Sequence, residues 1–112
     1  MAKRLDEVRV IRGSRNVFAD LGYRDAGERQ TKLRLAYAIN GLIGARKLTQ
    51  TAAAQVLGVN QPKVSALLHY KLEGFSVERL MSFLTALDCD VEISIRPKSR
   101  SKSAGTISVI AV

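Results

Sequence analysis

The sequence predicts a small, mainly helical domain of five helices that ends in a β-strand or a β-hairpin. Apolar residues recur with the spacing of three and four that is typical of amphipathic helices over most of the chain. Two of the helical segments are short and meet at Gly58. The period then changes to two, because Val91, Ile93 and Ile95 alternate with polar residues as in a half-buried strand.

Two helices are predicted in the first half of the chain. Asn16 is a candidate N-cap for a one-turn helix over residues 17–21. Asp25, with Glu28 three residues later, has the spacing of a capping box. A longer helix is therefore expected to begin there and to run to about Arg46.

The longer helix has an apolar stripe, and two glycines interrupt its sequence. Gly41 and Gly44 weaken a helix by about 1 kcal/mol each relative to alanine. Their lack of a side chain is expected to let a neighbouring helix pack closely. Leu33 and Tyr37 are expected to widen the stripe at its start. The stripe itself consists of Leu35, Ala38, Ile39, Leu42 and Ile43.

Residues 49–68 predict two short helices joined by a tight turn. Thr49 is the candidate N-cap of the first helix, and Gly58 ends it because a left-handed backbone suits glycine. Asn60 is the candidate N-cap of the second, and Pro62 lies in its first turn, where the missing N–H costs nothing. The apolar residues of the first helix are small enough for a close crossing: Ala53, Ala54, Val56 and Leu57.

The second short helix has two chemically different sides. Val64, Leu67 and Leu68 recur at i, i+3 and i+4 and are expected to face the core. A recognition helix docked in the DNA major groove presents polar side chains from its other faces. The alternative is an αα-hairpin that packs and binds nothing. The side chains on these other faces are Gln61, Lys63, Ser65 and Ala66.

A fifth helix is predicted after a turn over residues 70–74. Leu72 and Phe75 are expected to fill the core from this turn. Ser76 is the candidate N-cap of the helix, and Asp88 ends it. The apolar stripe of this helix consists of Val77, Leu80, Met81, Phe83, Leu84 and Leu87.

The C-terminal residues change from helical to extended character. Residues 91–96 predict a strand that ends at Pro97, and residues 98–105 are polar and basic. Residues 106–112 are strongly β-prone and would promote aggregation if exposed. A lone strand needs partners for its backbone groups, so we expect it to pair with a second copy across a two-fold axis. Pairing with the tail or with residues 8–11 is the alternative.

The net charge of the 112-residue chain is +8, and it is unevenly distributed. Residues 1–48 contain 11 Lys and Arg against 5 Asp and Glu, residues 49–97 contain 4 against 5, and residues 98–112 contain 3 against none. Two interpretations remain open. The charge supports solubility, or it attracts the phosphates of a nucleic acid to the segments that flank the two short helices.

The usage of cysteine and histidine argues against catalysis and against metal binding. Cys89 and His69 are the only residues of their types, so no intramolecular disulfide and no Cys/His cluster is expected. No glycine-rich phosphate loop is present, and no cofactor is expected. No apolar run approaches the roughly 20 residues of a membrane span, and no signal peptide opens the chain. We therefore expect a cytoplasmic protein that is not an enzyme.

The two short helices resemble the helix-turn-helix of phage-repressor-like regulators of the XRE type. Residues 16–97 resemble HigA-type antitoxins and their orphan relatives, most specifically over 16–22 and 75–80. This resemblance implies a five-helix phage-repressor-like DNA-binding domain with a C-terminal strand that helps members to dimerise. Residues 1–15 would form a basic arm, and residues 98–112 a basic linker and tail to which the family assigns no role. The matched helix-turn-helix residues are Gln50, Ala54, Gly58, Gln61, Val64 and Leu67.

The resemblance also implies roles for individual residues. Gln50 would contact a phosphate and brace Gln61, whose amide would reach a base edge, with adenine as the expected partner. Lys63 would contact guanine or a phosphate. Ser65 and Ala66 would lie near the groove wall, where Ala66 could touch a thymine methyl group. The other phosphate-contact candidates are Thr51, His69 and Lys71.

The leading functional hypothesis is a sequence-specific DNA-binding transcriptional regulator. We expect a repressor that binds operator DNA as a homodimer through the helix near residues 60–68. One alternative is an antitoxin that neutralises a RelE-like toxin. The other is a protein-interaction module without DNA binding, which agrees with the nearly balanced charge of residues 49–97.

Overall fold

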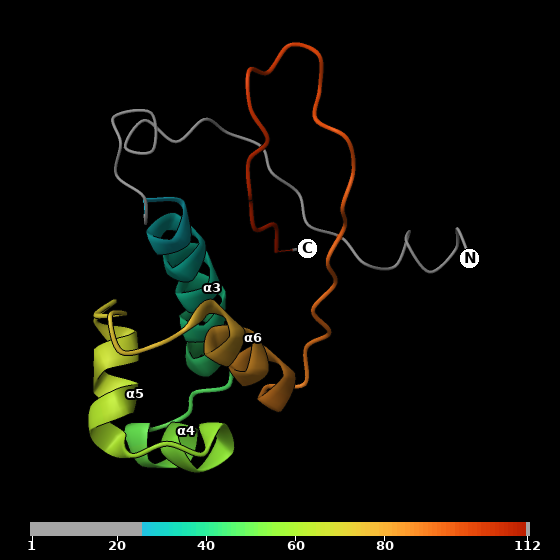
Figure 1. Cartoon of the computed structure of the whole chain (residues 1–112). Coiled ribbons are helices and arrows are strands. Elements are labelled where there is room, and N and C mark those ends of the chain that lie inside the picture. The colour runs from blue at the N-terminus through green and yellow to red at the C-terminus, as the bar shows by residue number, and fades with distance from the viewer. Residues whose placement is uncertain (1–25, 112) are drawn as a thin grey trace. The chain divides into compact units, whose positions relative to one another are not determined.

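The computed structural model describes residues 26–111 (Figure 1). The chain divides into two compact units. One is Lys32–Val91, which contains the helical core, and the other contains the described residues outside that range. The predicted N-terminal arm, the helix over 17–21 and the Asp25 cap lie outside the described residues.

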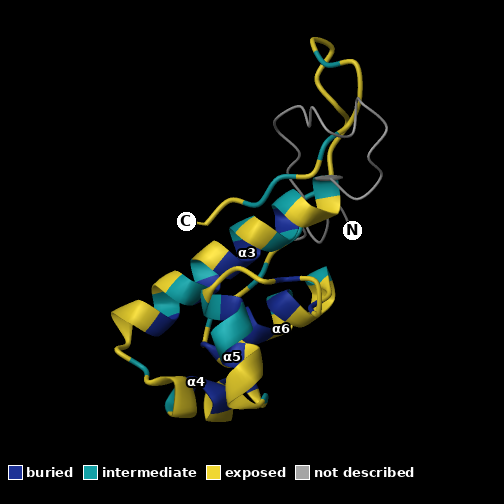
Figure 2. Cartoon of the chain, turned by 90° about the vertical axis from the view of Figure 1, so that its left-hand side faces the viewer, coloured by how far each residue is buried: buried dark blue, intermediate teal, exposed yellow. Residues whose placement is uncertain are grey.

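The described residues contain four helices and no strand. Their bounds are α3 (Ala26–Ala45), α4 (Gln50–Leu57), α5 (Gln61–Leu68) and α6 (Val77–Ala86). The prediction of a mainly helical domain is confirmed, with four of the five expected helices among the described residues. The buried faces of the helices turn toward one another (Figure 2).

The core is built from aliphatic side chains of all four helices and from the turn between α5 and α6. Leu72 and Phe75 enter it from this turn, as their apolar character predicts, and are 5% and 4% exposed. The ring of Phe75 meets Phe83 edge-on, with centroids 5.8 Å apart, an arrangement that aromatic pairs favour. The largest fully buried side chains are Ile39, Val64, Leu67, Leu80, Phe83 and Leu87.

The apolar stripe of α3 is narrower than the sequence predicts. Leu35 and Ile39 are buried, but Leu33 is 42% and Tyr37 74% exposed. Each exposed residue precedes a buried one by two positions, which is about 200° around a helix and therefore the opposite side. The expectation that Leu33 and Tyr37 extend the core is wrong. On α4, Val56 is likewise exposed rather than part of the packed face.

The two glycines of α3 are not packing sites. Gly41 and Gly44 are both exposed, and a Cβ atom added at either would meet nothing within 4 Å. The expected close approach of a neighbouring helix is therefore wrong. What remains is the entropic cost of a glycine in the interior of a helix.

We predict that Gly41→Ala and Gly44→Ala each raise the free energy of unfolding by about 1 kcal/mol, because alanine is the better helix former and has room. Urea denaturation followed by circular dichroism measures the effect. Gly58→Ala is the matched control and should destabilise, because Gly58 has φ 71°. A loss of stability in the α3 variants would mean that this face is covered in solution.

The predicted strand over residues 91–96 is not formed. Ser94 and Ser108 are isolated β-bridge residues, and no continuous ladder connects the extended segments on either side of the tail turn. Ile95 is 72% exposed, so the alternating pattern does not bury one face and nothing fixes a register. Pro97 also lacks the N–H that a ladder needs.

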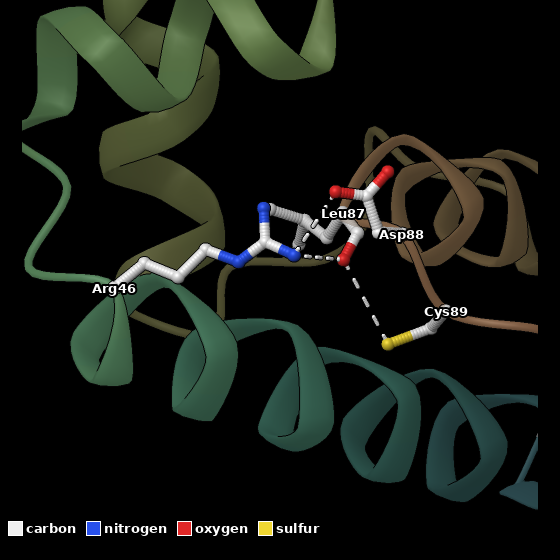
Figure 3. A network of polar contacts seen from close by, with 4 residues as sticks. All are labelled: Arg46, Leu87, Asp88 and Cys89. Carbon is white, nitrogen blue, oxygen red and sulfur yellow. Dashed lines mark hydrogen bonds and ion pairs between the residues drawn. The ribbon is translucent and has the colours of Figure 1, made fainter.

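A polar contact joins the C-terminal ends of α3 and α6 (Figure 3). Arg46 Nη2 donates to the backbone carbonyl of Leu87 and lies 3.3 Å from Asp88 Oδ2. The carbonyl contact matters more than the ion pair, because the Asp88 side chain is 84% exposed and solvent screens its charge. Carbonyls at a helix end have no intrahelical donor, and Arg46 supplies one. The Cys89 thiol approaches the same carbonyl at 3.9 Å.

Candidate nucleic-acid interface

Local hydrogen bonds determine the length of α4. The Thr49 side chain accepts from the backbone N–H of Ala52 at 3.1 Å and begins the helix, as predicted. Gly58 adopts φ 71° and ends it. The backbone N–H groups of Gly58 and Val59 both donate to the carbonyl of Ala54, so the chain reverses immediately after the last helical turn. This corner separates α4 from α5 by only three residues.

The start of α5 is equally well determined by its sequence. Asn60 Oδ1 accepts from the backbone N–H of Lys63 at 2.9 Å, and Pro62 lies in the first turn, as predicted. Val64 and Leu67 are fully buried. The opposite side of the first turn is exposed, and it contains Gln61, Pro62 and Lys63.

Asn40 of α3 forms a hydrogen bond with the C-terminal end of α5. Its Nδ2 donates to the carbonyl of Leu67 at 3.0 Å, and its Oδ1 is buried with no hydrogen-bond partner. Asn40 is not among the residues predicted from the sequence to take part in the interface. The available signal was a lone amide between Ile39 and Ile43 on the buried side of an apolar helix. The contact positions α5 against the core.

The side chain of Gln61 is held by Thr51. Gln61 Nε2 donates to Thr51 Oγ1 at 2.8 Å. The hydrogen bond that the family resemblance assigned to Gln50 is thus made by the next residue of α4. One N–H and the carbonyl oxygen of the Gln61 amide remain outside this contact, and the Thr51 hydroxyl retains its own proton for donation.

Lys63 contacts the turn that follows α5. Its Nζ donates to the carbonyl of Gly74 at 3.1 Å and lies 4.8 Å from the centroid of the Phe75 ring. A Cβ atom on Gly74 would lie only 2.9 Å from this ammonium group, so glycine leaves room for the contact. The ammonium has three N–H donors, and this carbonyl uses one of them.

The remaining candidate residues lie along α5 and just beyond it. Ser65 and Ala66 are half-buried, whereas His69 and Lys71 are exposed. His69 Nδ1 lies 2.8 Å from the carbonyl of Ser65 in the last turn of α5. Tyr70 has φ 59°, and this left-handed residue turns the chain away from the helix. Gln50 and Thr51 are exposed at the start of α4.

The described residues show no metal-binding group. No three His, Cys, Asp or Glu side chains among residues 26–111 lie together in an arrangement that could hold an ion. None of the helices in this part of the chain combines the length and the apolar character needed to cross a membrane. The polar groups gathered around α5 are amides, hydroxyls, an imidazole and ammonium groups, which are hydrogen-bonding partners of bases and phosphates.

Comparison with known proteins identifies the family. Residues 17–96 match the model of a helix-turn-helix domain family. A solved structure described as a "Putative XRE Family Transcriptional Regulator" is 68% identical to the chain. The match covers 79% of this chain and 99% of that one, with a TM-score of 0.76. The chain belongs to the XRE family of helix-turn-helix transcriptional regulators. No curated protein matches the sequence.

Membership of the XRE family assigns a function to the α4–α5 unit. The two helices and Gly58 are the helix-turn-helix of a DNA-binding transcriptional regulator. The matched region ends at residue 96, so residues 97–112 lie beyond the family model.

We predict that Asn40→Ala lowers the free energy of unfolding by about 1 kcal/mol. The carbonyl of Leu67 loses the Asn40 donor but still accepts from the backbone N–H of Tyr70 at 3.1 Å, which limits the loss. Urea denaturation measures it. The control Gln55→Ala, at an exposed position of α4, should change stability by less than about 0.5 kcal/mol. Equal stability of both variants would contradict a positioning role for Asn40.

Proposed function

We propose that this XRE regulator is a repressor that binds operator DNA as a homodimer, with α5 in the major groove. The observation that supports this most directly is the amide of Gln61, which is exposed at the start of α5 and oriented by Thr51. The remaining carbonyl oxygen and N–H of the amide match the N6 donor and N7 acceptor of adenine. An oriented amide loses less conformational entropy on binding than a free one.

The other interface residues are proposed to surround this base contact. Thr51 and Lys71 would donate to phosphates on either side of the groove, together with His69 near the end of α5. Ser65 and Ala66 would face the groove wall. Lys63 has two N–H donors beyond its contact with Gly74, and these would reach a guanine or a phosphate.

The proposed dimerisation is supported by the small surface of α5 that is available to contact bases. α5 has eight residues, and only its first turn contains fully exposed polar side chains, which would reach the base edges. Each good base contact contributes about 1–3 kcal/mol of discrimination, which is too little for one protomer to select an operator. Two copies related by a two-fold axis would read two half-sites about 34–36 Å apart.

We predict that Gln61→Ala weakens binding to the operator in the promoter region of its own gene by roughly 5- to 150-fold per half-site, because each protomer loses one bidentate base contact. Fluorescence anisotropy with labelled duplexes measures this loss. Gln55→Ala on α4 is the matched control and should bind like the wild type. The footprint should show two half-sites separated by one turn of DNA.

The outcomes separate the alternatives. Wild-type affinity in Gln61→Ala would exclude the proposed base contact. If the wild-type protein binds neither its own promoter nor other duplex DNA, the interaction-module alternative replaces the repressor.

A second function as a HigA-type antitoxin is favoured by a different observation. Leu33 and Tyr37 lie one turn apart on α3, and both are substantially exposed. Exposed apolar side chains on one face of a helix are typical of protein-interaction sites. The partner would be a RelE-like toxin.

We predict that, if a RelE-like toxin gene lies beside this gene, co-expression of the wild-type protein restores the growth of cells that produce the toxin. The double variant Leu33→Asp and Tyr37→Asp should lose this protection, because two carboxylates would be buried at the interface. The same variant should retain operator affinity. Growth that the wild type fails to restore would rule out the antitoxin function.

A further inference from the structure

The helix-turn-helix contributes little positive charge of its own. Among residues 49–68, Lys63 is the only charged residue. Its ammonium group already contacts a carbonyl and an aromatic ring. Protein affinity for DNA depends strongly on the number of phosphates that cationic side chains neutralise, because each such contact releases condensed counterions. One cation supports few phosphate contacts, so the further positive charge needed for tight binding must come from other segments.

The C-terminal tail carries a dense cluster of cations. Arg96, Lys98, Arg100 and Lys102 lie within seven residues, and residues 93–112 contain no Asp or Glu. Arg96, Lys98 and Arg100 are exposed, and Lys102 is half-buried. We refer to residues 96–102 as the basic turn.

Hydrogen bonds give the basic turn a defined local shape. The backbone N–H of Lys102 donates to the carbonyl of Ser99 at 3.1 Å, and Lys98 Nζ donates to the carbonyl of Lys102 at 2.9 Å. The backbone N–H of Ser101 approaches Ser99 Oγ at 3.3 Å, and the two serine hydroxyls lie 2.9 Å apart. The tail doubles back at this turn, as both views of the chain show (Figure 1 and Figure 2). Ammonium, guanidinium and hydroxyl donors are thus gathered on one short loop.

We infer that the basic turn is a second DNA-binding element that contacts backbone phosphates without reading sequence. The inference rests on the proposed operator binding by α5 and adds an electrostatic contact to it. The segment between Asp88 and Arg96 contains seven residues and spans at most about 25 Å, so this length limits how far the turn can reach from the end of α6. A tethered contact has a high effective concentration once α5 has docked. Residues 97–102 of the basic turn lie beyond the region that matches the family model.

The experiment removes the charge of the basic turn from the full-length protein. In the triple variant Arg96→Gln, Lys98→Gln and Arg100→Gln, which changes the three exposed cations of the basic turn, up to three phosphate contacts per protomer are lost. A matched control, Lys32→Gln, Arg34→Gln and Arg79→Gln, lowers the net charge by the same amount at positions on α3 and α6. The affinity of each protein for operator DNA and for a duplex of unrelated sequence is measured by anisotropy between 50 and 200 mM salt.

We expect the slope of log K against log salt to become less steep by up to about 2.7 per protomer in the tail variant, at about 0.9 per contact. Over this fourfold range of salt, the wild-type protein would then lose up to about 40-fold more affinity per protomer than the variant. The loss should be the same for both duplexes, and the control should keep the wild-type slope. An unchanged slope in the tail variant, or an equal change in the control, would overturn the inference.

Two further readouts separate this inference from the proposed function. If the wild-type protein does not distinguish operator from unrelated DNA but the tail variant weakens both, the basic turn binds DNA and the proposed base reading by α5 is wrong. If operator binding is specific but independent of the tail, the proposed function stands and the inference fails. Sedimentation velocity identifies the remaining case: a tail variant that has become monomeric would show that the tail is a dimer contact rather than a DNA contact.

Discussion

The left-handed turn at Gly58 is the constraint on which the DNA-facing surface depends. Both N–H groups that follow the last turn of α4 donate to the carbonyl of Ala54, so the helix ends abruptly and the chain reverses before the cap of Asn60 begins α5. A residue with a side chain would be strained at φ 71°. Because the corner is so short, α4 and α5 must approach closely, and the small, buried side chains of Ala53 and Ala54 permit this.

The rest of the domain fixes α5 by contacts at its two ends. Asn40 holds the last turn through a carbonyl, and Lys63 ties the first turn to the loop that leads into α6. Both contacts use polar side chains to support the helix. The first turn of α5 is therefore well ordered by its surroundings but contains only one cation, Lys63. Rigid elements of this kind are suited to reading base edges, whereas affinity for phosphates is better supplied by flanking cations.

The sequence by itself determined where most of the described helices begin and end. Thr49, Asn60 and Ser76 cap the three helices that follow them, and each accepts a hydrogen bond from a backbone N–H three residues later. Gly58 ends α4 through its own backbone conformation. These interactions connect residues within one turn of each other, so they depend on local residue types and not on the rest of the fold. The residues of the helix-turn-helix could therefore be recognised without coordinates.

Only the tertiary structure decided which partners distant residues meet. It showed that Leu33 and Tyr37 face away from the core, because the packing of the other helices selects one side of α3. It also showed that Thr51 rather than Gln50 holds Gln61, a choice that depends on how α4 crosses α5. The alternation that ends at Ile95 did not become a strand, because a strand requires a paired neighbour in register and not only a period of two. In each case the deciding contact lies outside the segment whose sequence was interpreted.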